Sequence, residues 1–327
     1  MNRTLLIVLC IIGLAGLVAV PFFPHVIYPV FAMRVMCLAL FACAFNILLG
    51  HTGILSFGHA AFFGSAAYFC GYMLKEQGLS PEIGILTGVI GASLMGAVFG
   101  ALATRRSGIY LAMITLALSQ LVYFVFLRLP WTHAEDGMQR IPRGVLLGII
   151  DLRSPINLYF VVLTLTLLGL WLVHRIVHSP FGEVLRAIRD HEPRTRSLGY
   201  PVARYKILAF TLSAGLAGLA GSLKVIIYQV ASLRDVHWSM SGDVILMTLL
   251  GGMNSVFGPV LGAALISSLY HYFDNLGGCV TIMVGTIFII WVLIFRRGIV
   301  GQAEMMIEWL RPARLPENHK DSDNGSN

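Results

Sequence analysis

The sequence predicts an all-α fold, a polytopic membrane helix bundle of about 8–10 transmembrane segments with some short or broken helices. Hydrophobic residues make up 57% of the 327 residues, and charged residues only 12%. Soluble domains carry roughly twice that charged fraction, about 25%. The mean hydropathy is +0.79. Apolar stretches follow one another with short breaks, and no acidic residue precedes Glu76.

The candidate spans are ten apolar stretches: 4–20, 30–49, 54–74, 83–103, 109–128, 157–176, 207–229, 242–253, 256–272 and 279–295. The third opens after Gly53 and contains further glycines, whereas the eighth is short and ends near Gly251. Short or glycine-interrupted spans are typical of the broken helices of transporters. The stretches 242–253 and 256–272 are therefore either two spans or one re-entrant pair.

Arginine-rich loops predict the orientation, because loops that stay in the cytoplasm carry an excess of Arg and Lys. Such residues gather at Arg105–Arg106, in the 177–206 loop and after the last span. Counting spans from a cytoplasmic Arg3 places all three regions in the cytoplasm. Arg34 is the one charge that this orientation does not explain.

The same count defines the domain organisation. We expect one transmembrane domain over 1–311, with a long cytoplasmic loop at 177–206 and a periplasmic loop at 129–156. The tail at 312–327 is polar and poor in aromatic residues, so we expect it to be disordered. Both termini then lie in the cytoplasm, and the expected location is the bacterial inner membrane.

Several function classes have little support in the sequence. The net charge of +7 lies in loops between apolar stretches, so no nucleic-acid partner is expected. The five cysteines are scattered, and we expect no metal site and no cofactor bound by this chain. No G-x-x-x-x-G-K-[ST] motif occurs, so ATP and Mg²⁺ would be used by a separate subunit. Ser56 and His59 lie three residues apart and leave an intramembrane enzyme as a minor alternative; we expect no catalytic residues.

The long cytoplasmic loop predicts a helix–turn–helix. Ser179-Pro180 is a typical helix start, because a capping hydroxyl precedes a proline at the first helical position. The apolar residues that follow repeat on one helix face, and Pro193 ends that helix. Gly199 suits a left-handed position at the end of a second turn. An amphipathic helix lying in the lipid interface is the alternative reading.

Four motifs occur in order: Gly50–Gly64, Gly108–Ala117, Ser179–Gly199 and Gly251–Pro259. Together they resemble the permeases of ATP-binding-cassette (ABC) importers for branched-chain amino acids, most closely the LivM-type subunit. The resemblance covers about residues 30 to 301. Thr52, Ile54 and Asn254 depart from residues that are common in the family.

The resemblance implies a heteromeric importer and no enzymatic activity in this chain. The implied partners are a second related permease subunit, cytoplasmic ATP-binding subunits that hydrolyse ATP, a periplasmic substrate-binding protein and the lipid bilayer. The Ser179–Gly199 motif corresponds to the family's coupling loop. The residues expected to couple it to the ATPase are Glu183, Arg186, Arg189, Asp190, Glu192 and Gly199.

Polar residues within apolar spans are the candidates for the substrate path: Asn46, Ser56, His59, Thr115, Ser119 and Gln120. Hydrogen bonding between helices is the alternative role for each of them. The expected substrates are leucine, isoleucine and valine, with urea, short amides or other apolar amino acids as alternatives. A secondary transporter is less expected, because Asp243 and Asp274 are the only acids at the edges of apolar spans.

Overall fold

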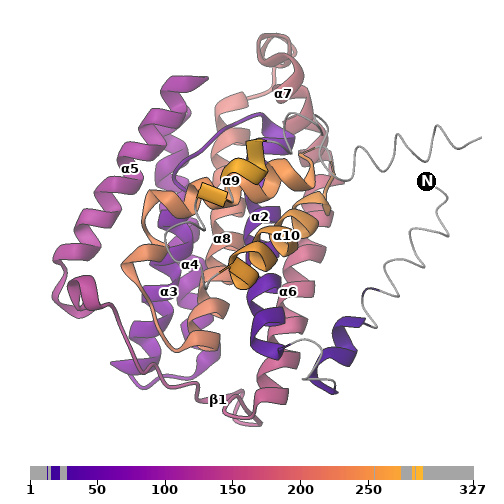
Figure 1. The fold of residues 1–327 in the computed structure, drawn as a ribbon. Coiled ribbons are helices and arrows are strands. Elements are labelled where there is room, and N and C mark those ends of the chain that lie inside the picture. The colour runs from indigo at the N-terminus through magenta and orange to yellow at the C-terminus, as the bar shows by residue number, and fades with distance from the viewer. Residues whose placement is uncertain are drawn as a thin grey trace, which may run out of the picture.

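The computed structural model describes residues 13, 16–22, 28–253, 255–273, 282–283 and 285–289. They form a helix bundle, so the predicted all-α class is confirmed (Figure 1). Its helices are α2 (Pro29–Thr52), α3 (His59–Lys75), α4 (Pro81–Ala103), α5 (Ile109–Arg128), α6 (Pro155–Val177), α7 (Pro180–Ser197), α8 (Val202–Tyr228), α9 (Trp238–Gly251) and α10 (Gly258–Phe273).

Short elements complete the described part of the chain. Four are 3-10 turns: η1 (Val20–Phe22), η2 (Pro130–Thr132), η3 (Ala134–Asp136) and η4 (Leu233–Asp235). The strands in this part are β1 (Val145–Leu146) and β2 (Ile150–Asp151), which pair in an antiparallel hairpin. In Figure 1 this hairpin lies at the opposite end of the bundle from α7.

Five described helices are long and apolar enough to cross a membrane: α2, α4, α5, α6 and α8. The helices α3, α9 and α10 have 17, 14 and 16 residues, fewer than the roughly 20 that a span requires. The predicted third span is wrong at its start, because the helix begins at His59 and residues 53–58 are not helical. The stretches 4–20 and 279–295 lie largely outside the described residues, and the 312–327 tail lies wholly outside them.

The helices α2 and α8 form the centre of the bundle. In each, 83% of the most apolar window is buried, against 28% in α4 and α5 and 39% in α6. A helix that is hydrophobic all round is expected to be buried on all sides. Both short helices, α9 and α10, contact α2, and Figure 1 shows them beside it. The outer faces of α4, α5 and α6 are left for lipid or for other chains.

Small residues permit close helix contacts at this centre. A Cβ atom on Gly96 of α4 would lie 2.8 Å from the carbonyl oxygen of Phe210 in α8. A Cβ atom on Gly218 of α8 would lie 2.5 Å from the Cβ of Ala92. Packing of backbones at such short range is the usual role of small residues in membrane helices.

The 129–154 connection is held to the end of α8 by hydrogen bonds. The Arg143 guanidinium donates to the carbonyl oxygens of Ile226 and Ile227, at 3.2 and 2.8 Å. These carbonyls lie in the last turn of the helix, where a cation also interacts favourably with the helix dipole. Partial burial lowers the pKa of Arg143. Met138 pairs with Ala231 in an antiparallel bridge beside this contact.

We predict that Gly96→Val lowers the stability of the detergent-solubilised chain by about 1–3 kcal/mol, because an overpacked contact must be relieved by moving helices. The measurement is the midpoint of thermal unfolding. Gly242→Ala is the control, since a Cβ atom there meets no atom within 4 Å. Equal midpoints for Gly96→Val and the wild type would contradict the close α4–α8 contact.

Candidate functional site

Helix α7 begins at Pro180, as the sequence predicts. The Ser179 hydroxyl accepts a hydrogen bond from the Gly182 amide at 3.4 Å and donates to the carbonyl of Ile176 at 2.7 Å. Position 182 requires glycine, because a Cβ atom there would clash with the carbonyl group of Val177. The turn between α6 and α7 is therefore tight, and it fixes the direction in which α7 leaves the bundle.

The apolar face of α7 packs on the protein. Leu185 and Ile188 are buried in the same core cluster as α2 and α8. The ring of Phe181 stacks on Tyr205 of α8, with 5.6 Å between centroids. Contacts with α2, α6 and α8 hold the helix. Its apolar face therefore contacts the bundle, which differs from the alternative of a helix lying in the lipid interface.

A kink divides the loop into two helical pieces. His191 has non-helical angles (φ −151°, ψ 84°), two residues before Pro193. The Thr195 hydroxyl lies 3.0 and 3.1 Å from the carbonyl oxygens of Ala187 and His191, so it bridges the kink. Gly199 has φ +89°, the left-handed conformation expected for it.

The predicted coupling residues form two groups: the first has charged side chains exposed to solvent, and the second has side chains that bond to other helices of the bundle. Glu183 and Asp190 are exposed, each with 66% of the side chain accessible, and Glu183 pairs with Arg186 at 2.9 Å. Arg189 lies 3.5 Å from Asp190 and also donates to the carbonyl of Gly50 in α2. The first group can meet a partner, whereas Arg189 also connects α7 to α2.

Glu192 belongs to the second group. Its carboxylate accepts from Lys206 Nζ at 2.7 Å and from Arg196 at 3.2 Å. Only 6% of the Lys206 side chain is exposed. The pair connects the kinked part of α7 to the second turn of α8, so Glu192 forms a contact within the chain. Lys206 was not among the predicted site residues, and only its position at the start of an apolar span singles it out.

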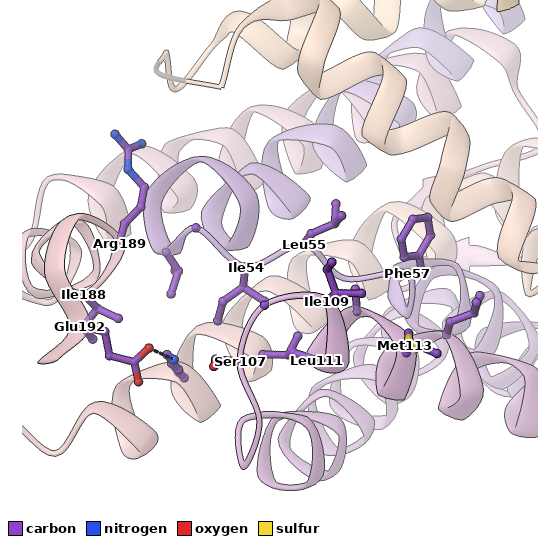
Figure 2. A pocket seen from close by; sticks show the side chains of 16 residues that line it. Ile54, Leu55, Phe57, Ser107, Ile109, Leu111, Met113, Ile188, Arg189 and Glu192 are labelled. Atoms are coloured by element: carbon purple, nitrogen blue, oxygen red, sulfur yellow. Dashed lines mark hydrogen bonds and ion pairs between the residues drawn. The ribbon is translucent and has the colours of Figure 1, made fainter.

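A pocket of about 520 Å³ lies beside this ion pair (Figure 2). Its walls come from Thr52–Leu55 and Phe57, from part of the 107–116 stretch, from α7 and from Lys206 of α8. Glu192 lies at one end in Figure 2, and Phe57 and Met113 lie at the other. Three of the four sequence motifs thus meet around one cavity. None of the six predicted path residues lines it.

The stretch 53–58 enters the bundle without helical structure, so its backbone groups need other partners. The Phe57 amide donates to the Thr115 hydroxyl at 3.1 Å, and the Ser241 hydroxyl donates to the Phe57 carbonyl at 2.8 Å. Ser241 also accepts from the Ala60 amide at 2.9 Å, and Ser56 accepts from the Gly58 amide at 3.2 Å. These hydroxyls replace the missing helical bonds.

The turn between α9 and α10 is held in a similar way. Asn46 of α2 donates to the carbonyl of Ser255 at 2.9 Å. A Cβ atom on Gly50 would contact the carbonyl of Met253, so the turn packs directly on α2. The Gly50 carbonyl is also the acceptor of Arg189. One turn of α2 therefore contacts both α7 and the α9–α10 hairpin.

His59 serves in a buried hydrogen-bond chain. Its Nε2 lies 2.9 Å from the Ser213 hydroxyl, which donates to the Ala44 carbonyl at 2.6 Å. Nε2 must therefore carry the proton in this network. His59 bonds to Ser213 and Ser56 accepts from the Gly58 amide, and no hydrogen bond joins Ser56 to His59 among the described residues. Of the other path candidates, Ser119 is buried and Gln120 is half-buried on α5.

Exposed apolar side chains near the end of the loop were also missed. Leu198 is 69% exposed, and Tyr200 is 43% exposed. Both residues are close in sequence to the charged residues of α7. Their position after the Pro193 kink is the only sequence signal for them.

A model of the family described as "Branched-chain amino acid transport system / permease component" matches residues 29–296. The chain belongs to this family. The resemblance seen in the motifs is confirmed, and the chain is a multi-pass membrane permease component. No solved structure matches the chain.

Individual relatives show the breadth of the family. The permease is 31% identical to the high-affinity branched-chain amino acid transport permease LivM of Escherichia coli over 248 residues, which are 68% of this chain and 57% of that protein. For LivM of Salmonella typhimurium the identity is 29% over 259 residues, which are 72% of this chain and 61% of that protein. The chain thus spans about six tenths of these relatives. It is also 29% identical over 194 residues (55% of this chain, 52% of the relative) to LsrC of Klebsiella pneumoniae, an autoinducer 2 import permease.

In this permease, we predict that Thr115→Val destabilises the fold by about 1–3 kcal/mol, because the Phe57 amide loses its acceptor in a dry environment. Thr164→Val is the matched control, since Thr164 is exposed and its hydroxyl bonds only to the carbonyl of its own helix. Thermal unfolding in detergent measures both variants. If they lose the same stability, Thr115 does not support the 53–58 stretch.

We also predict that Glu192→Gln costs about 1–3 kcal/mol, because it leaves the Lys206 ammonium buried without its carboxylate. Glu183→Gln breaks an exposed pair and should cost less than about 1 kcal/mol. Adding Lys206→Met to Glu192→Gln should restore part of the loss, as a double-mutant cycle of unfolding midpoints will measure. Additive losses would mean that the two side chains do not interact.

Proposed function

We propose that this permease is the LivM-like membrane subunit of an ABC importer for branched-chain amino acids in the bacterial inner membrane. It pairs with a second, related permease subunit. Separate cytoplasmic subunits bind ATP and Mg²⁺ and hydrolyse ATP, and a periplasmic binding protein delivers the substrate. The observation that carries the proposal is α7, which packs its apolar face on the bundle and leaves charged side chains exposed.

The contacts of α7 support a coupling role. A partner that moves α7 also moves what α7 holds, and Arg189 connects it to Gly50 in α2. The same turn of α2 packs against the α9–α10 turn. Glu192 and Lys206 connect the far end of α7 to α8. A push from the ATPase would thus reach two central helices and the hairpin, as alternation between two global states requires.

The relatives support the substrate class but allow others. LivM proteins are named for branched-chain amino acids, whereas LsrC is named for autoinducer 2 import. We propose leucine, isoleucine and valine, because the two LivM proteins match this chain at 29% and 31% identity over about seven tenths of its length. Exposed apolar residues along α5 and α6 are available for lipid and for the second permease.

The test is co-purification of an ATPase with the solubilised, full-length chain from its host. Glu183→Ala/Arg186→Ala should reduce ATPase recovery at least about tenfold while the chain stays in the membrane, because charged anchors at an interface centre carry much of the binding energy. Asp136→Ala/Arg140→Ala, in the connection between α5 and α6, is the control and should bind the ATPase normally. A chain that purifies alone and carries leucine into proteoliposomes without ATP would instead be a secondary transporter.

A further inference from the structure

Two opposite charges lie on α2 and α9, near the end of α10 and away from α7 and its pocket. Arg34 is in the second turn of α2, and Asp243 is in the second turn of α9. Both side chains are half-buried. Ionisable residues within the membrane part of a protein are costly and usually serve a function. Neither residue belongs to the four motifs, and Arg34 is the charge that the loop pattern leaves unexplained.

Packing brings the two charges together. The ring of Phe31 lies 4.8 Å from that of His271, so the start of α2 lies beside the end of α10. Arg34 follows Phe31 by three residues and shares its helix face. Tyr270 of α10 donates its hydroxyl to Asp243 at 3.2 Å. The charges of Arg34 and of the exposed Arg234 both act on Asp243 and Tyr270, and that of Arg234 acts more strongly.

Both charges still have free bonding capacity within the described part of the chain. Arg34 forms no hydrogen bond or ion pair with another described residue. The Asp243 carboxylate accepts only the Tyr270 hydroxyl there. A guanidinium can bind a carboxylate through two parallel hydrogen bonds, and a carboxylate can accept hydrogen bonds from several donors. The pair is therefore a dipolar site with an unfilled donor fork and an unfilled acceptor.

We propose that Arg34, Asp243 and Tyr270 form a site that receives the charged head group of a zwitterionic amino acid during translocation. Arg34 binds the α-carboxylate, and Asp243, oriented by Tyr270, binds the α-ammonium. A neutral amide or a sugar-like substrate has no carboxylate for Arg34 and no ammonium group for Asp243. This inference rests on the proposed function and narrows it to amino acids with two charged groups.

The chemistry also explains why the charges are separate. A direct Arg34–Asp243 ion pair would be satisfied and would compete with the substrate. A site that binds through two charge-assisted contacts can hold a zwitterion while it is removed from water. It can also release the zwitterion when the helices move, because the charges lie on different helices.

The test measures uptake of radiolabelled leucine by host cells that carry chromosomal variants. Arg34→Gln and Asp243→Asn should each lower the maximal rate by about 10- to 100-fold, as loss of a charge-assisted contact predicts. The leucine concentration at half-maximal rate should not change, because the binding protein sets it. The controls Arg128→Gln and Asp136→Asn remove charges elsewhere and should leave uptake unchanged.

A second readout separates binding from folding. Leucine-stimulated ATP hydrolysis by the purified assembly should persist in Arg34→Gln and Asp243→Asn, whereas a damaged bundle would lose it. The conservative variants Arg34→Lys and Asp243→Glu should recover at least a third of the uptake. Wild-type uptake in the neutral variants, or no rescue by the conservative ones, overturns the proposal.

The outcome for the wild type tests the proposed function separately. If wild-type cells show no ATP-dependent leucine uptake that depends on this chain, the importer function fails whatever the variants do. If the wild type imports leucine and the neutral variants do so equally well, only the head-group site fails.

Discussion

The need to satisfy every backbone polar group inside the bilayer is the constraint on which this structure depends. Continuous helices meet it by themselves, but this chain interrupts its helices at residues 53–58 and again between α9 and α10. At the first break, Thr115 and Ser241 bond to the freed backbone of Phe57. At the second, Asn46 bonds to the Ser255 carbonyl. Each interruption is therefore possible only where a hydroxyl or amide from another helix reaches it.

Those bonds require the helices to come very close, and the small residues allow it. Gly96 and Gly218 place α4 and α8 at backbone contact, and Gly50 does the same for α2 and the Met253 carbonyl. Because lipid tails are as apolar as leucine, close packing and interhelical hydrogen bonds must supply the stability that the hydrophobic effect supplies in water. The broken helices and the glycines are thus two parts of one arrangement.

The same arrangement places α7 where a force on it would spread to other helices. Helix α7 lies on the ends of α2, α6 and α8, and it contacts them through an apolar face and through two polar connections. Because α2 is buried nearly throughout, a displacement at Gly50 cannot be absorbed at a free surface. The hairpin that packs on the same turn also carries Asp243, so it connects the proposed coupling helix with the proposed head-group site.

The sequence by itself determined the membrane class, most helix bounds and the start and kink of α7. Each of these follows from local chemistry: apolar length, a capping Ser179 before Pro180, and Pro193 within a helical pattern. Hydropathy placed the start of the third span at residue 54, five residues before the helix begins. Apolar composition alone does not distinguish a helix from a non-helical stretch such as Ile54–Phe57, whose backbone bonds to Thr115 and Ser241.

The tertiary structure decided which polar residues meet. Glu192 looked like its neighbours Glu183 and Asp190, and only the fold turned it toward Lys206. Arg34 and Asp243 are more than 200 positions apart, and nothing in either segment indicates the other. The side-chain pattern along a helix specifies a face, but the partner of that face depends on helix packing between distant segments, which one sequence does not encode locally.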